Sequence, residues 1–151
     1  MSKRGETIAT LFGACATILI WNFSAFGQSS VKAMFEKYNL FGTFAFDCSK
    51  PVGTSNRYYV HRVLDENHVQ RDMMSGPTTR DFVVVFDQVS ELRPGEISVS
   101  GTRDGKPVSS IYRVEPTRMR VIESTADGKV EITGGRFVNG GETPWANKCG
   151  N

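Results

Sequence analysis

The sequence predicts an all-β domain: an antiparallel up-and-down barrel of about eight strands, with a short N-terminal helix and a disulfide-tethered C-terminal tail. From about residue 43 to about residue 137, apolar and polar side chains alternate with a period of two, which is the period of a strand. Short turns join most of these segments, and no connection between them contains a helix long enough to serve as the crossover of a parallel sheet. Eight strands in series leave two unpaired edges unless the sheet closes, so a barrel is favoured over an open sheet.

A helix is expected over residues 29–40, with Ser29 or Ser30 as its N-cap and Gly42 at its end. Its apolar residues recur at i, i+3, i+4 and i+7, and they are Val31, Met34, Phe35 and Tyr38. The strands are expected, in order, at residues 43–48, 57–65, 68–74, 80–89, 96–103, 106–114, 117–125 and 129–133. Asp104-Gly105 and Asp127-Gly128 join two of the hairpins, because type I′ turns need positive φ at both central residues and favour Asp-Gly.

Residues 1–27 have the layout of a secretory signal peptide. Two basic residues precede an apolar run at residues 8–23, and the small-x-small triplet Ala25-Phe26-Gly27 follows it. Cleavage after this triplet would leave residues 28–151 as a single domain in the periplasm or outside the cell. Two alternatives stay open, namely a retained membrane anchor and a lipid attached to Cys15.

The charge of the chain excludes some classes of partner. Its net charge is +2 at pH 7, and loss of the leader brings it to about +1. A near-neutral chain gives no electrostatic reason to expect nucleic acid or an anionic membrane surface as a partner. Charged residues interrupt both faces of the expected strands, whereas an outer-membrane barrel needs an unbroken apolar band. We therefore expect no stable membrane insertion once the leader is removed.

Two cysteines remain outside the leader, and they lie at the two ends of the domain. Cys48 closes the first strand, and Cys149 is two residues from the C-terminus. The first and last strands of an up-and-down barrel are neighbours, so a disulfide between these cysteines is geometrically reasonable. In the chain-entropy model, a crosslink that closes a loop of about 100 residues contributes at most about 4.7 kcal/mol. No Cys-x-x-Cys is present to suggest a metal or redox site. Nearby, Trp145 would either pack on the barrel or line a ligand site.

Two segments carry a resemblance to known proteins. Gly42-Thr43-Phe44 opens the first strand near the place where lipocalin-like (calycin) barrels have Gly-x-Trp, with phenylalanine here in place of tryptophan. The chain also resembles small secreted proteobacterial proteins of unassigned function. These share an aromatic-x-x-Asp-Cys-Ser-Lys-Pro segment, here residues 44–51, and a Trp-x-x-Lys-Cys segment, here residues 145–149. The resemblance covers most of residues 28–151 and implies a secreted lipocalin-like barrel.

The sequence contains no recognisable catalytic pattern. Gly-x-Ser-x-Gly, a phosphate-binding glycine loop and His-Glu-x-x-His are all missing, so no catalytic residue, metal site or cofactor is predicted. With a two-residue turn at Glu66-Asn67, His68 would face Asp65 and His61 would face Asp72 across a hairpin. Such pairs can relay protons, but they also occur as plain cross-strand polar contacts. Arginines outnumber lysines in the strands, and any that point inward would suit an anionic ligand.

These observations predict an exported, non-enzymatic barrel that binds a small, partly apolar molecule. The residues expected to line its site are Phe44, Phe46, Tyr58, Val60, Phe82, Val84, Phe86, Val99 and Tyr112. The alternative is a barrel with a filled interior that acts through its outer surface as an interaction or structural module of the cell envelope. A hydrolase or isomerase that uses His61 or His68 is the third class. An interior cavity larger than a few water molecules would favour the first hypothesis, and a packed interior would favour the second.

Overall fold

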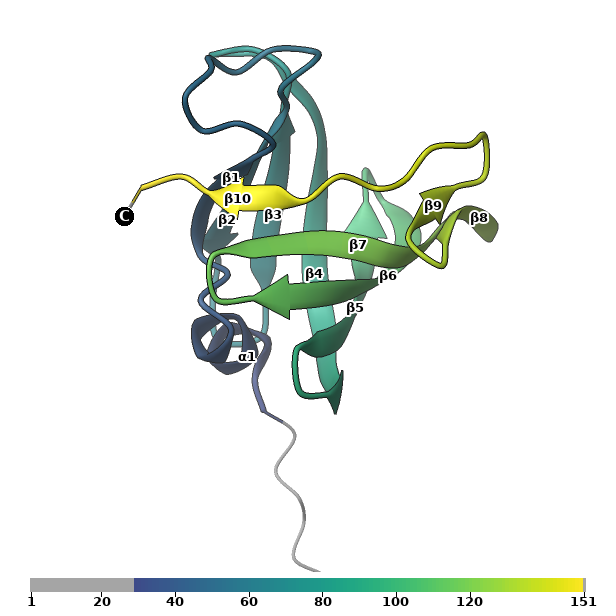
Figure 1. Ribbon diagram of the computed structural model, residues 1–151. Coiled ribbons are helices and arrows are strands. Elements are labelled where there is room, and N and C mark those ends of the chain that lie inside the picture. The colour runs from purple at the N-terminus through teal and green to yellow at the C-terminus, as the bar shows by residue number, and fades with distance from the viewer. Residues whose placement is uncertain (1–28, 151) are drawn as a thin grey trace, which may run out of the picture.

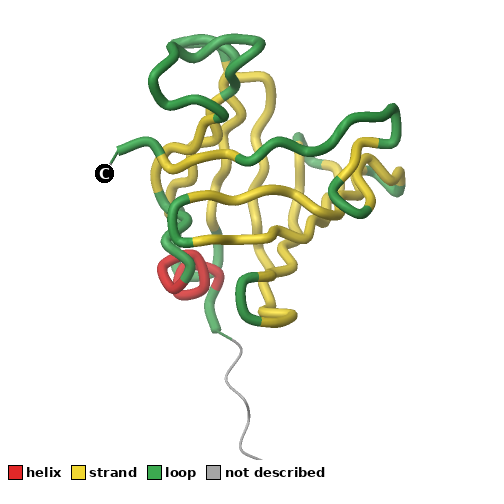
Figure 2. Tube along the Cα trace, viewed as in Figure 1, coloured by secondary structure: helices red, strands yellow, loops and turns green. Residues whose placement is uncertain are grey.

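A computed structural model describes residues 29–150, which are all-β apart from one short helix (Figures 1 and 2). The helix α1 spans Val31–Lys37. Ten strands follow it: β1 (Gly42–Ala45), β2 (Tyr58–Val63), β3 (Val69–Met74), β4 (Arg80–Arg93), β5 (Glu96–Arg103), β6 (Lys106–Glu115), β7 (Arg118–Ala126), β8 (Lys129–Thr133), β9 (Arg136–Phe137) and β10 (Ala146–Lys148). The predicted leader, with Cys15, lies outside the described residues. Between residues 29 and 150, no helix is long and apolar enough to cross a membrane.

Eight of the strands form a closed antiparallel barrel, as the sequence predicts. Strands β1 to β7 pair in chain order, and the short strand β10 pairs with both β1 and β7. Phe44 lies opposite Lys148 on one side of β10, and Met119 lies opposite Ala146 on the other. The C-terminal tail therefore supplies the closing strand, a role that β8 would have in a plain meander.

Strands β8 and β9 lie outside the ring of eight. β8 pairs with the last residues of β7, from Ser124 onward, and β9 pairs only with β8 (Figure 1). β10 takes the first residues of the same strand, at Arg118 and Met119. Strand β7 is thus shared along its length between two partners. The β8–β9 hairpin forms an arm that extends from one end of the barrel.

The helix α1 lies at the opposite end of the barrel from this arm (Figure 1). Ser30 caps it, because its hydroxyl accepts a hydrogen bond from the Ala33 amide. The Phe35 side chain is fully buried, and its ring centroid lies 5.8 Å from that of Phe86 and 5.4 Å from that of His61. The buried face of the helix, Val31, Met34 and Phe35, therefore packs into the core at this end of the barrel.

The predicted disulfide is present and joins the two ends of the domain. Cys48 follows β1 and Cys149 follows β10, with their Cα atoms 5.2 Å apart. The Cys149 amide donates to the Thr43 carbonyl at 2.8 Å, which continues the pairing of β10 with β1. The bond thus holds the closing strand of the barrel to the first one.

Candidate functional site

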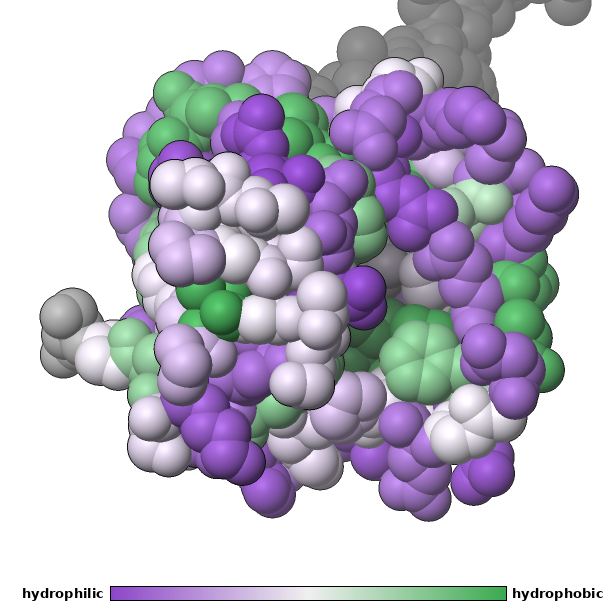
Figure 3. Space-filling model, turned by 90° about the horizontal axis from the view of Figure 1, so that it is seen from above, coloured by the Kyte–Doolittle hydropathy of each residue, from purple (hydrophilic) through white to green (hydrophobic). Residues whose placement is uncertain are grey.

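The barrel interior is packed at one end and hollow at the other. A cavity of about 680 Å³ occupies the half nearer the β8–β9 arm. This volume falls within the ~300–1,000 Å³ of small-molecule sites and far exceeds the ~30 Å³ share of a water molecule. Seen from above, the surface is hollowed at this end, and hydrophobic side chains lie among hydrophilic ones around the hollow (Figure 3). The cavity therefore opens to solvent and has room for a ligand.

Apolar side chains from the barrel and from the arm form the walls of the cavity. The barrel contributes Met73 from β3, Phe82 from β4, Val108 from β6, and Val121 and Ala126 from β7. The arm and the segment after it contribute Val130, Ile132, Phe137, Val138 and Pro144. Val130, Phe137 and Val138 are exposed, which is unusual for large apolar groups unless they meet a partner or ligand. These residues make the arm an apolar rim beside the opening.

Polar groups gather at the floor of the cavity, where it meets the packed half. Arg71 on β3 is 7% exposed, and its Nη1 donates a hydrogen bond to the Tyr112 hydroxyl on β6. Ser110 and Ser124, also on the floor, are buried with their hydroxyl oxygens 3.3 Å apart. Tyr59 on β2 lies beside them and lines the same cavity. The floor thus offers several hydrogen-bond donors around a single guanidinium.

Two ion pairs stand at the mouth of the cavity. Arg103 at the end of β5 forms a two-pronged pair with Glu131 of the arm, with N–O distances of 2.6 and 3.2 Å. Lys106 pairs with Asp127 at 3.0 Å. The Arg103 guanidinium also lies over the Phe82 ring, 5.2 Å from its centroid. The Arg103–Glu131 pair connects the arm to the barrel. Both of its side chains are partly exposed at the mouth, whereas the walls deeper in the cavity are apolar.

The nine residues that the sequence predicts as ligand-binding do not lie together in the structure: some line the cavity, some belong to the core and two lie on the other face of β2. Phe82 lines the cavity, and Tyr112 lines a small extension of it beneath. Five members belong to the buried core cluster, and they are Phe44, Val84, Phe86, Val99 and Tyr112. Phe46 is partly buried against the cluster, facing Tyr59 at 6.0 Å between ring centroids. Tyr58 and Val60 alternate along β2 with Tyr59 and His61, so they lie on the other face of the strand.

Sequence reasoning missed the two residues that characterise the floor, Arg71 and Tyr59. Both faces of β2 carry a tyrosine, so periodicity alone could not show which one points inward. Arg71 is one of many arginines in the strands, and the sequence does not indicate which of them point inward. Its flanking residues Val69 and Met73, two positions away on either side, were the available signal, because all three share one face of the strand.

The two histidines do not form a catalytic arrangement. The expected pairing of His61 with Asp72 is wrong, because the turn after β2 is longer than two residues and the register moves by one, which places His61 opposite Arg71. His61 is buried, and its Nδ1 donates to the Leu40 carbonyl at 2.7 Å. Burial, followed by the Arg71 charge, lowers the pKa of His61 to about 3, so the imidazole is neutral. His68 does contact Asp65, at 2.8 Å, in an exposed turn, and neither residue lines the cavity.

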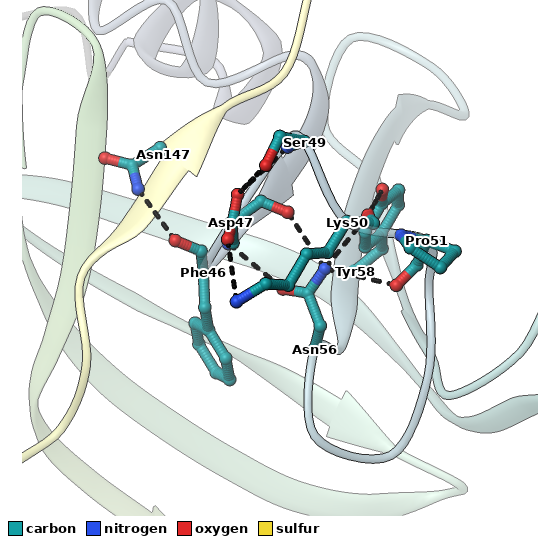
Figure 4. A network of polar contacts seen from close by, with 8 residues as sticks. All are labelled: Phe46, Asp47, Ser49, Lys50, Pro51, Asn56, Tyr58 and Asn147. Carbon is teal, nitrogen blue, oxygen red and sulfur yellow. Dashed lines mark hydrogen bonds and ion pairs between the residues drawn. The ribbon is translucent and has the colours of Figure 1, made fainter.

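The segment that carries the resemblance forms a structural loop (Figure 4). The Asn56 side chain donates to the backbone carbonyls of Asp47, Lys50 and Pro51 at 2.9, 3.1 and 3.2 Å. Its Oδ1 accepts from the Asp47 amide at 3.0 Å. Hydrogen bonds from Ser49, and then the contact with Lys50, lower the pKa of Asp47 to about 2. These contacts fold residues 47–56 into a compact loop beside the disulfide.

Trp145 lies outside the cavity, against the guanidinium groups of Arg118 and Arg120. Their central carbons are 4.3 and 5.4 Å from its ring centroid. Cation–π contacts of this kind hold the tail against the barrel next to the closing strand β10. Of the two roles considered for this residue, the structure supports packing on the barrel.

No family model matches this chain, and no curated protein or solved structure matches it either. Within residues 29–150, no group of three or more His, Cys, Asp or Glu side chains is placed to hold a metal ion.

Proposed function

We propose that this chain is an exported barrel that binds a small, partly apolar molecule in the cavity beside the β8–β9 arm. The observation that carries the proposal is the cavity itself, a hollow of about 680 Å³ with apolar walls and an open mouth. Small-molecule sites are usually pockets lined mainly by apolar side chains, with a few polar groups that orient the ligand. The Cys48–Cys149 disulfide is compatible with export, since such bonds persist in oxidising compartments.

The test uses two matched substitutions on neighbouring residues of β6. Ser110 points into the cavity, whereas Ser109 is exposed on the outer side of the barrel. We expect the wild-type protein to enhance the fluorescence of N-phenyl-1-naphthylamine, an uncharged apolar probe. Ser110→Trp fills part of the cavity and should lower the affinity for the probe at least tenfold, whereas Ser109→Trp should leave it unchanged. Far-ultraviolet circular dichroism of both variants verifies that the fold is kept.

Failure of the wild-type protein to bind any uncharged apolar probe would contradict the proposal. It would favour the alternative of a barrel that acts through its outer surface. Equal loss of binding in the two serine variants would show that the probe binds elsewhere on the molecule.

A further inference from the structure

Arg71 is a buried cation for which the described part of the chain supplies no anion. Its side chain points inward from β3 and lines both the main cavity and the small extension beneath it. None of the ion pairs among residues 29–150 includes it. The Nε atom is buried without a hydrogen-bond partner. A charge held in this way destabilises a folded protein unless something else compensates it.

Three aromatic residues surround the guanidinium, and of these the Tyr112 hydroxyl accepts a hydrogen bond from it. The central carbon of the guanidinium lies 5.3 Å from the centroid of Phe86 and 5.8 Å from those of Tyr59 and Tyr112. These cation–π contacts offset part of the desolvation and fix the plane of the group. The side chain that carries the remaining N–H donors lines the cavity. The guanidinium is therefore oriented, buried and only partly hydrogen-bonded.

The neighbouring hydroxyl groups add donors at the same place. The Tyr112 hydroxyl accepts from Arg71, and its own proton is free for a further acceptor. Burial raises the pKa of Tyr112, so the phenol stays protonated and can donate. Ser110 and Ser124 carry two more hydroxyl groups on the floor. An oxyanion placed there would find a charged donor and neutral donors together.

The single buried guanidinium of the lining favours an anion with one negative charge. His61, next to Arg71 across the strands, is neutral, as its lowered pKa shows. Arg103 and Lys106, at the mouth, already pair with Glu131 and Asp127. Lys129, which also lines the cavity, is exposed, and the Arg120 guanidinium beside the small extension lies over the Trp145 ring. Arg71 is therefore the buried cation available to a ligand on the floor. A carboxylate carries one charge and matches the guanidinium fork, whereas a phosphate monoester carries about −1.5 to −2.

We propose that the cavity binds an amphipathic monocarboxylate, whose carboxylate accepts hydrogen bonds from Arg71 and Tyr112 and whose apolar part lies along the walls. This inference rests on the proposed function, because it assigns the ligand class of the same cavity. The apolar part extends from the floor past Val108 and Val121 toward the rim of the arm, where exposed apolar residues continue the wall. The charged head is then the deepest part of the ligand.

The test compares two ligands with the same ten-carbon chain, decanoate and 1-decanol, by displacement of the bound fluorescent probe. We expect the wild-type protein to bind decanoate at least tenfold more tightly than decanol. Arg71→Met keeps the length of the side chain and removes the charge, so it should abolish this preference and leave decanol binding within twofold. Arg93→Met, at the far end of the barrel beside Glu96, is the matched control for loss of one positive charge and should keep the preference. Tyr112→Phe removes one donor and should weaken decanoate binding several-fold, and it serves if Arg71→Met does not fold.

The outcomes separate this inference from the proposed function. If the wild-type protein binds decanol and decanoate equally well, and Arg71→Met changes neither, the carboxylate assignment is overturned while the apolar site stands. If decyl phosphate binds more tightly than decanoate, the preference for one negative charge is overturned. If the wild-type protein binds none of the three, the proposed function itself fails.

Discussion

His61 and Arg71 share the barrel interior, where burial and then the Arg71 charge keep the imidazole of His61 neutral. They lie opposite each other on β2 and β3, and both side chains are buried. Burial disfavours an imidazolium, and the nearby guanidinium disfavours it further. The result is an interior with a single positive charge and a neutral imidazole at neutral pH. Because the pKa of His61 is lower in the folded chain than in the unfolded chain, the stability of the protein depends on pH.

We expect the free energy of unfolding to fall as the pH drops below about 6.5. The unfolded chain binds a proton at His61 near pH 6.5, whereas the folded chain does so only near pH 3. Within this window the unfolded state binds more protons, so stability decreases on acidification, by about 1.4 kcal/mol per pH unit for one site. Urea unfolding at several pH values measures the slope. His61→Gln should reduce it, and His68→Gln, at the exposed turn, should not.

The useful window for this measurement lies above about pH 4.5, the ordinary pKa of Glu91 and Glu96, whose ion pairs with Lys37 and Arg93 lower their pKa values in the folded protein. Asp47 has a pKa lowered to about 2, so its stabilising contribution is lost only as the pH falls below its ordinary value of 3.8. Between these limits the change in slope reports His61. An identical slope in wild-type protein and His61→Gln would show that the imidazole is protonated in the folded state.

The individual strands could be predicted because their signals are local. Asp104 and Asp127 have φ values of 51°, and the glycine after each also has positive φ, as expected for Asp-Gly turns. Alternation also places Phe82, Val84 and Phe86 correctly on one face of β4. The division of that face between cavity and core could not be predicted. It depends on where α1 packs: Phe86 contacts Phe35 of the helix, whereas Phe82 lies beyond its reach.

Pairing irregularities are the second feature that the sequence does not reveal. The register of β4 with β5 shifts between Phe86 and Gln88, and β5 carries a glycine, Gly101, opposite Phe86. A Cβ atom at Gly101 would lie 1.9 Å from the Val85 carbonyl oxygen, because the two backbones approach so closely there. Glycine in a strand often marks such a place, but its partner cannot be known before the fold is.

We expect Gly101→Ala to lower the free energy of unfolding by about 2–3 kcal/mol, at the upper end of the usual range for one substitution. The added methyl group meets backbone atoms rather than a movable side chain, so relief requires the β4–β5 pairing to shift. Ser100→Ala on the same strand is the control and should change stability by less than about 0.5 kcal/mol. Chemical denaturation measures both. A small effect at Gly101 would mean that the two strands are further apart than the structure places them.

The molecule as a whole is a barrel whose closure depends on the three residues of β10. β10 has three residues, yet it is the only strand that joins β1 to β7 within the described chain. Its contacts include the Lys148 amide donating to the Thr117 carbonyl at 2.8 Å and the disulfide that follows. The cavity borders this junction, because Pro144, just before β10, is part of the cavity wall. Closure of the barrel and integrity of the site are therefore linked.

This arrangement predicts a specific effect of removing the disulfide. The bond joins residues 101 positions apart, and chain entropy gives it at most about 4.7 kcal/mol. We expect the Cys48→Ser, Cys149→Ser double variant to lose part of this stability and to open first at β10, because three residues cannot hold the strand alone. Hydrogen exchange should therefore accelerate most at the amides of Lys148 and residue 149, and much less in β4 and β5, whose pairing extends over many residues. Probe binding should weaken together with this local opening, since the cavity wall begins at Pro144. A uniform acceleration in all strands would instead show that the disulfide only stabilises the barrel globally and has no separate role in its closure.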